Sequence, residues 1–411
     1  MSRNLILTLT IGVLLTTLLA PLCHGVGFYN PDQSISAQGQ ADAVVARPQD
    51  PSAVYYNPAG IVHLPPWEVT VGAQALFVDL EHVNTLGAKQ KATDTFFIPH
   101  VYFSANPPNS RFAAGLGINS PFGLGTDWGA QSFARYIAPY SELKLLMVNP
   151  NVAYRITDGL SVAAGADFYT ADLTFDRFVP SMALPGLLPP GMDLGTSLEL
   201  DGDAWGWNVA LLYDISERIS IGASYRSKAD IDFSGPMKTY PPTPLSASAS
   251  LDLHLPSMVK AGIAFKPTEA LTVEFDVDWL EWSRFKNVTV SFSPPVLPPE
   301  ISPREWDDAF LYSIGAEYAF PKKWKVRAGY GYAESPIPDH TYEPGIPRND
   351  VHVVAIGVGK SFGKLSFDVA CTFVLSEERT VDSAVGEPFL SVDGEYDGLV
   401  TILGGGVSYS F

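Results

Sequence analysis

Histidines are the side chains of this protein best suited to acid–base chemistry or to activating a nucleophile. Beyond the first 25 residues they are His63, His82, His100, His254, His340 and His352. A hydrolase would place one of them beside an activated Ser or Cys, and no partnered Ser motif accompanies any of the six. His340 lies among the acids of PDHTYEP, a pattern that is able to hold a cation but is more often only solvated. The sequence therefore predicts no enzyme, no metal site and no cofactor.

The stretch DPSAVYYNPAGIVHLPPW, residues 50–67, concentrates turn-forming residues ahead of the regular part of the chain. Asn57, Pro58 and Gly60 favour turns, and prolines withhold a backbone donor from any β-ladder. Plain linkers are usually polar, whereas aromatic and apolar residues flank this turn on both sides. The composition indicates a segment that packs against another part of the protein.

Residues 1–25 have the features of a secretory signal: Arg3, an apolar run and a short polar end. We expect cleavage after Gly25. Cys23 raises the alternative of a lipoprotein signal, but Leu22 before it is larger than the residue that such signals need. The domains expected are the signal peptide at 1–25, an N-terminal segment at 26–66 and one folded domain at 67–411.

The composition limits the possible classes of protein. The net charge of −18 argues against a nucleic-acid partner, because binding phosphates needs a basic surface. After the signal only Cys371 remains, so no internal disulfide is expected. Charged residues make up 17% of the chain and aromatic residues 12%, yet no run of about 18 apolar residues follows the signal. Two classes remain: a soluble β-rich protein or an outer-membrane β-barrel.

Apolar and polar residues alternate with period two in long stretches. The clearest are ISIGASYRSKADIDF, LTVEFDVDW and KLSFDVACTF. Soluble strands centre on about 5–6 residues, whereas a tilted strand that crosses a bilayer needs about 9–11. Aromatic residues often begin or end the apolar faces, as expected for the girdles at the two membrane interfaces. The alternation therefore favours the membrane barrel.

We expect fourteen antiparallel strands, near residues 67–81, 94–105, 111–118, 143–157, 160–177, 201–215, 218–233, 249–266, 270–287, 306–320, 324–333, 350–361, 364–377 and 397–411. Every link from an even to an odd strand is a tight turn, and the other links are longer and mostly rich in Pro. Short turns on one side and long loops on the other are typical of outer-membrane barrels. Such a barrel must close, because an open edge in lipid leaves backbone groups unpaired. The last strand would pair with the first and end on Phe411, the aromatic residue that outer-membrane assembly machinery commonly reads.

A barrel of fourteen strands is wider than its inward side chains can fill, since about eight strands are just filled. Residues 26–66 precede the first strand and start on the periplasmic side. A flexible tail would have the same position, but several aromatic residues would then be exposed. We therefore expect residues 26–66 to be a hatch that plugs the lumen.

The segment GFYNPDQSISAQGQADAVVARPQDPSAVYYNPAGI resembles the N-terminal hatch of the FadL/TodX family, the outer-membrane transporters of long-chain fatty acids and aromatic hydrocarbons. Other resembling stretches are NSPFGLGTDW, VNPNVAYRITDGLSVAAG, LPSMVKAGIAF, WLEWSRF, WDDAFLYSIGAEY, VRAGYGYAESPIPD and PRNDVHVVAIGVG. The resemblance implies a fourteen-stranded barrel with an inner hatch that includes Phe28, Asn57, Pro58, Ala59 and Gly60. It also implies binding inside the barrel and sideways exit through a gap at a kinked third strand.

The predicted gate is the stretch Pro121-Phe122-Gly123. Pro121 cannot donate to a ladder, and Gly123 allows a bend where pairing breaks. The residues alone fit equally well an ordinary loop after a strand that ends near residue 118. The resemblance favours the kink, which we place at Gly123.

The resemblance also gives Arg177, in FDRF, the position of a pocket arginine that contacts a fatty-acid head group. An arginine at the rim of a strand is the alternative. A second basic residue that fatty-acid members carry before the tenth strand is expected to be replaced here by Asp307 or Asp308, which favours a neutral substrate. Composition and position suggest that the pocket is also lined by Phe122, Trp128, Phe178 and Trp205.

The predicted function is passive uptake of hydrophobic small molecules through the outer membrane of a Gram-negative bacterium. The expected partners are such a ligand, membrane lipid and the assembly machinery, and the protein is expected to be a monomer. The alternatives are a general porin or structural barrel without a hydrophobic ligand, and an enzyme acting on lipids, which the unpartnered histidines disfavour.

Overall fold

A computed structural model describes residues 26–183, 189, 191–241, 247–295, 299–385 and 391–411. The predicted signal peptide, its cleavage site and Cys23 lie outside these residues. None of the helices in the described part is long and apolar enough to cross a membrane.

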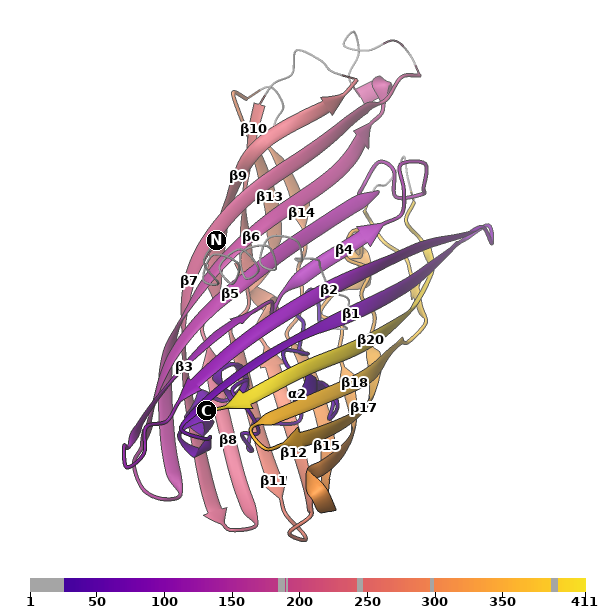
Figure 1. Ribbon diagram of the computed structural model, residues 1–411. Helices are drawn as coiled ribbons and strands as arrows, with labels where there is room; N and C mark the ends of the chain where they lie inside the picture. Colours follow the sequence, from indigo (N-terminus) through magenta and orange to yellow (C-terminus); the bar gives the residue numbers. More distant parts are fainter. Residues whose placement is uncertain (1–25, 184–188, 190, 242–246, 296–298, 386–390) are drawn as a thin grey trace, which may run out of the picture.

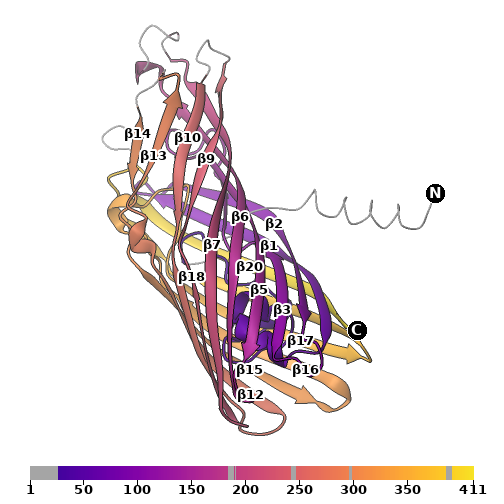
Figure 2. The same ribbon diagram turned by 90° about the vertical axis from the view of Figure 1, so that its left-hand side faces the viewer.

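The wall is built of β-strands that run steeply around one lumen (Figures 1 and 2). Its first half consists of β1 (Trp67–Asn84), β2 (Lys89–Ala105), β3 (Phe112–Asn119), β4 (Gly123–Asp127), β5 (Tyr140–Arg155), β6 (Leu160–Val179), β7 (Leu194–Ser216), β8 (Ile219–Arg226), β9 (Ala229–Tyr240) and β10 (Ala247–Leu255). Its second half consists of β11 (Met258–Phe265), β12 (Leu271–Leu280), β13 (Asn287–Ser293), β14 (Glu300–Pro303), β15 (Ala309–Phe320), β16 (Trp324–Ala333), β17 (Val351–Phe362), β18 (Leu365–Ser376), β19 (Arg379–Val381) and β20 (Gly394–Ser410).

These segments form fourteen wall strands, because six of the wall strands are each divided into two consecutive segments. The divided strands are β3/β4, β8/β9, β10/β11, β12/β13, β14/β15 and β18/β19. Neighbouring strands pair antiparallel around the wall, and β20 returns to pair with β1 from Glu68↔Ser410 to Asn84↔Gly394. The predicted closed, all-β, fourteen-stranded antiparallel barrel is confirmed.

The links differ at the two ends of the barrel. Three of the tight turns are residues 217–218, 321–323 and 363–364, all at the same end. At the other end β6, β7, β9, β10 and β13 form the part of the wall that extends farthest (Figures 1 and 2). Short turns and long loops therefore separate to opposite ends, as in outer-membrane barrels.

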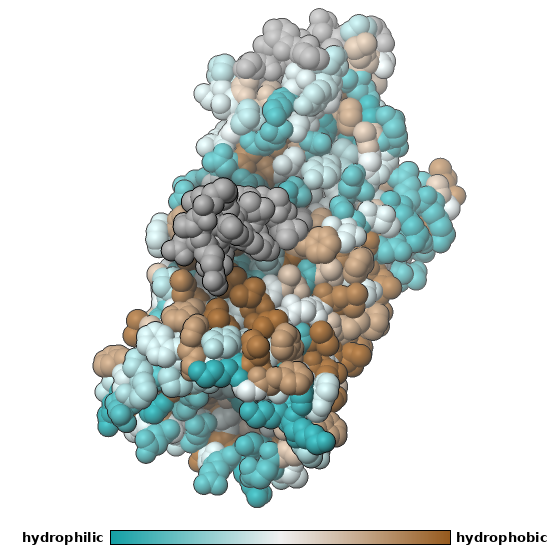
Figure 3. All heavy atoms as spheres, in the orientation of Figure 1, coloured by the Kyte–Doolittle hydropathy of each residue, from teal (hydrophilic) through white to brown (hydrophobic). Residues whose placement is uncertain are grey.

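Burial alternates along the strands, as along β1, where every second residue is buried. The outward residues include many large apolar side chains, among them Val71, Phe275, Ile314, Val369 and Leu403. In Figure 3 apolar side chains gather over the middle of the face, and hydrophilic ones dominate toward both ends. A closed wall with an apolar belt pairs most of its backbone internally and presents apolar side chains to lipid.

Residues 26–64 lie inside the barrel and are almost entirely buried. They form the short helices α2 (Ile35–Gln38) and α3 (Ala53–Tyr56) and the 3₁₀ helix η1 (Pro58–His63). In Figures 1 and 2 this indigo segment occupies the half of the lumen nearer the short turns. Its elements are too short to be stable alone, so their stability comes from packing against the wall. The remaining 3₁₀ turns are η2 (Ser181–Ala183), η3 (Trp282–Arg284), η4 (Pro321–Lys323) and η5 (Asp339–Thr341).

Candidate functional site

A cavity of about 320 Å³ lies in the lumen on the side of the long loops. Most of its lining is aliphatic or aromatic and comes from β5, β6, β7, β9, β10, β13 and the loop at residues 334–350. Representative residues are Leu143, Leu173, Phe175, Leu198, Leu251 and Val290. Ligand sites are typically apolar with a few polar groups, and this cavity fits that description.

The charged residues of the cavity form two ion pairs. Arg177 on β6 pairs through Nη1 with Glu300 on β14. Arg304 directly follows β14, and its Nη1 lies 2.7 Å from Oε2 of Glu343 in the loop at 334–350. The second pair is the drier one, with side chains 10% and 9% exposed against 25% and 42% in the first. Each cation of the cavity lining therefore has a carboxylate partner.

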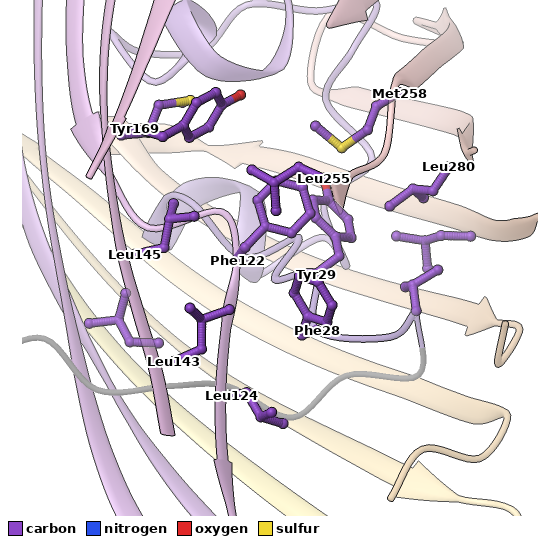
Figure 4. Packing of buried hydrophobic residues seen from close by; sticks show 14 of the residues in the cluster. Phe28, Tyr29, Phe122, Leu124, Leu143, Leu145, Tyr169, Leu255, Met258 and Leu280 are labelled. Carbon is purple, nitrogen blue, oxygen red and sulfur yellow. The ribbon is translucent and has the colours of Figure 1, made fainter. Parts of the chain in front are cut away.

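Phe28 belongs both to the cavity lining and to a buried aromatic cluster. Its ring centroid lies 4.6 Å from that of Trp282, 6.0 Å from that of Phe122 and 5.9 Å from that of Trp306. Edge-to-face contacts of this kind add to the stabilisation from burial. Figure 4 shows Phe28, Tyr29 and Phe122 together, with Leu124 and Leu143 beside them. The N-terminal segment thus forms one wall of the cavity.

The third wall strand is interrupted at the predicted position. β3 ends at Asn119 and β4 begins at Gly123, and both segments pair with β5. On the other side only Val101–Ala105 of β2 pair with β3, and residues 89–100 pair only with β1. The ladder between the second and third wall strands is therefore broken along β4. Part of the free edge is covered, because the amide of Phe133 donates to Oε1 of Gln90 at 2.9 Å.

The N-terminal segment pairs with this interruption through its backbone. The amide of Gly123 donates to the carbonyl of Phe28 at 2.9 Å, and the amide of Asn30 donates to the carbonyl of Pro121 at 2.8 Å. Tyr29 and Phe122 form the isolated bridge between these two bonds. The residues predicted for the gate and Phe28 from the predicted hatch are thus in direct contact.

The predicted hatch turn is held by several hydrogen bonds. Oδ1 of Asn57 accepts from the amide of Ala59 at 3.1 Å, which caps η1. Its Nδ2 donates to the carbonyl of Val45 at 2.8 Å and to that of Leu211 in the wall at 3.1 Å. A Cβ at Gly60 would lie 2.6 Å from Cβ of Pro48, so only glycine fits there. Tyr55 and Tyr56 are fully buried, with ring centroids 5.1 Å apart.

Acidic side chains of β12 hold the middle of the segment. Oδ2 of Asp276 accepts from the amides of Val44 and Val45 at 2.7 and 2.9 Å, and Glu274 accepts from the amide of Ala46.

Within the segment, burial raises the pKa of Asp32 to about 6. Burial also raises the pKa of Asp42, and the negative charge of Asp32 adds to the effect. Burial therefore makes both carboxyls harder to ionise than exposed aspartates.

Four of the residues expected to line the pocket lie elsewhere. Phe122 is buried against Phe28 but does not line the cavity. Trp128 is buried and donates to the carbonyl of Pro344 at 2.9 Å, but it does not line the cavity. Phe178 instead packs against Arg135, whose guanidinium carbon Cζ lies 3.7 Å from the centroid of the Phe178 ring. Trp205 is 67% exposed on the outer face of β7. The expectation for Trp205 is wrong, because its odd position shares the lipid-facing side with Trp207 and Val209.

Sequence reasoning missed Arg304, Glu300 and Glu343. It expected Asp307 or Asp308 in place of a second basic residue, whereas Asp308 accepts hydrogen bonds from Trp279 and Ser283. The basic residue before β15 is Arg304. The available signal was the pattern EISPRE, which places Glu300 and Arg304 four residues apart beside a Pro-rich loop.

The loop at residues 334–350 folds inward and connects the parts of the site. Trp128 donates to the carbonyl of Pro344 in this loop. The hydroxyl of Thr126 on β4 donates to the carbonyl of Gly345 at 3.3 Å. Nε of Arg348 donates to the carbonyl of Gly27 at 3.0 Å. The same loop thus touches the cavity, the interrupted strand and the start of the N-terminal segment.

Comparisons with known proteins agree with this architecture. The family profile described as "Outer membrane protein transport protein (OMPP1/FadL/TodX)" matches residues 16–411. A "Long-chain fatty acid transport protein" of Escherichia coli O6:H1 is 24% identical over 455 residues and covers 100% of both chains. "Outer membrane protein P1" of Haemophilus influenzae is 27% identical over 311 residues, covering 68% of this chain and 66% of its own.

Solved structures share the fold. A FadL homologue of Pseudomonas aeruginosa superposes with a TM-score of 0.83 at 18% identity, covering 94% of this chain and 100% of its own. The toluene transporter TodX of Pseudomonas putida superposes with a TM-score of 0.75 at 19% identity, covering 94% and 99%. At these identities the structures establish the barrel and its inner segment as a fold.

Proposed function

Because the chain belongs to the outer-membrane transport protein family OMPP1/FadL/TodX, we propose that it takes up small hydrophobic molecules through the outer membrane. The observation that carries this proposal is the apolar cavity whose inner wall is Phe28. An apolar solute gains free energy there by leaving water, by about 25 cal/mol for each Å² of surface that is buried. The related fatty-acid and toluene transporters are consistent with this class of ligand.

We propose that the ligand leaves sideways at the interruption of the third wall strand. Phe28 supports this route, because it touches the cavity and its carbonyl accepts from the amide of Gly123. The unpaired edge of β2 supports it as well. Unpaired backbone groups are costly in lipid, so a broken ladder in such a wall suggests a functional opening. Lateral exit would spare an apolar molecule from crossing water.

Residues 26–66 are the plug in this proposal, and residues 67–411 are the barrel. The burial of the segment and its bonds to β12 support the assignment. A ligand that displaces the ring of Phe28 would strain the backbone pair at Tyr29 and Phe122. Opening would then require the segment to shift only near its start, while Asn57 and β12 hold the rest.

A reversible cross-link tests the route. Tyr29 and Phe122 form a non-hydrogen-bonded antiparallel pair, for which Cα atoms lie about 4.5 Å apart, within the range of a disulfide. The variant carries Tyr29→Cys, Phe122→Cys and Cys371→Ser. We expect uptake of a radiolabelled aromatic hydrocarbon by cells to fall several-fold when the cross-link is oxidised and to recover with reductant.

The matched control places Thr70→Cys and Ser408→Cys in the wall, where the two hydroxyl oxygens are 2.7 Å apart, in the same Cys371→Ser background. Oxidation of this pair should leave uptake unchanged. Equal uptake by the oxidised and reduced gate variant would contradict the lateral route. High conductance to small ions without any ligand would instead favour a general porin.

A further inference from the structure

The two ion pairs of the cavity raise the question of which hydrophobic molecules it accepts. Among the residues that the structure describes, their four side chains are the only charged ones in its lining. Arg177 and Glu300 come from β6 and β14, whereas Arg304 and Glu343 come from the end of β14 and from the loop at 334–350. The described part of the lining therefore has both signs of charge and no net charge.

Charge balance has a direct consequence for a carboxylate ligand. To bind either guanidinium, its head group must approach Glu300 or Glu343, and repulsion between like charges is strong in weakly polar surroundings. Displacing Glu343 would leave a buried carboxylate without its partner, which is costly, whereas displacing the more exposed Glu300 would cost less. An uncharged molecule meets neither obstacle, because it uses the aliphatic and aromatic lining.

We propose that Glu300 and Glu343 are specificity-determining residues that make the cavity select uncharged apolar molecules over long-chain carboxylates. The inference rests on the proposed function, since it assumes that the cavity binds the transported molecule. Glu343 has the larger effect of the two, because its pair with Arg304 is the less exposed. Removing either negative charge gives the cavity one free cation and admits a carboxylate.

Two ligands that differ only in charge test the proposal: palmitate and methyl palmitate. Their dissociation constants are measured on the purified full-length barrel in detergent by equilibrium dialysis. For Glu343→Gln we expect the palmitate constant to fall about tenfold, and for Glu300→Gln by a smaller factor. The constant for methyl palmitate should change by less than about threefold, since glutamine keeps the shape of the side chain.

Glu199→Gln is the matched control. Glu199 lies on the outer face of β7 and pairs with Lys238 of β9. The substitution changes the net charge of the protein by the same amount but lies outside the cavity. Its constants for both ligands should equal those of the wild type. Arg304→Met combined with Glu343→Met tests the pair itself: it should keep the methyl ester affinity and still bind palmitate weakly.

The outcomes separate the inference from the proposed function. Palmitate binding by the wild type as tight as that of the ester, or an unchanged palmitate constant in both glutamine variants, overturns the inference and leaves the transport of hydrophobic molecules intact. Failure of the correctly folded wild type and variants to bind either ligand contradicts both. Heat-modifiable migration of each variant in electrophoresis shows whether its barrel has folded.

Discussion

At the scale of single residues, Asn57 ties the N-terminal segment both to itself and to the wall. One side chain caps η1, bonds back to Val45 and reaches Leu211 in the wall. Its position in a short turn explains why an Asn-Pro-Ala-Gly stretch stands before the first strand. A side chain that accepts and donates at once is needed there, and alanine offers neither function.

We predict that Asn57→Ala loosens the N-terminal segment without unfolding the barrel. Loss of a cap costs about 0.5–2 kcal/mol, and the two buried carbonyls lose a donor as well. Limited proteolysis of the purified protein should cut within residues 26–66 several times faster than in the wild type. Asn287→Ala, at the exposed start of β13, serves as the control, and equal cleavage of both variants would contradict the assigned role.

The residue scale is also where sequence reasoning met its limit. Arg177 was placed in a pocket by resemblance, but its partner Glu300 is 123 positions away. No local pattern connects two residues so far apart, because the contact depends on how wall and loop fold together. The wrong expectation for Trp205 was avoidable from the sequence alone. Residues of a strand alternate between its two faces, so Trp205 lies on the same side as Val209, which is the lipid side.

At the scale of elements, the interrupted strand shows what local residues leave open. Pro121 and the following glycines fit a kink and an ordinary loop equally well, and the family resemblance was needed to favour the kink. The missing ladder along β2 was not predictable, because it depends on where β4 goes after the break. The strands themselves were predictable, since their alternation needs only neighbouring residues.

We predict that the free edge of β2 is visible in amide exchange. In the antiparallel pair with β1, alternate amides of β2 point toward β1 and toward β4. Between residues 92 and 100 those pointing toward β4 have no ladder partner. In nanodiscs they should exchange at least about tenfold faster than their neighbours. The amides of β1 from 69 to 82, which is paired on both sides, provide the comparison, and uniform protection along β2 would argue for a closed wall.

At the scale of the whole molecule, the barrel and its inner segment contribute differently to stability. The wall closes on itself through the pairing of β20 with β1, whereas the segment has only short helices and is held by hydrogen bonds to the wall. A closed barrel without the segment should therefore persist, with a lumen too wide for its side chains to fill. The segment then acts as an occupant of the barrel rather than as its core.

We predict that deleting residues 28–64, with the signal retained, yields a folded barrel that conducts ions. In planar bilayers the deletion variant should show a single-channel conductance at least several times that of the intact protein, because a fourteen-stranded lumen is too wide for the side chains of its wall to fill. Uptake of hydrophobic molecules should fall together with the loss of Phe28 from the cavity. A folded deletion variant that remains closed would show that the loops, and not this segment, seal the barrel.

The seam between β1 and β20 has a consequence for the order of events during assembly. It joins residues such as Thr70 and Ser408, which are 338 positions apart. Contacts between distant positions form late, because the intervening chain must first be arranged. Until β20 pairs with β1, the N-terminal segment, which precedes β1, has no closed barrel around it. The barrel therefore closes around the N-terminal segment in the same late step that pairs β20 with β1. A delay in that pairing leaves both the strand edges and the segment exposed.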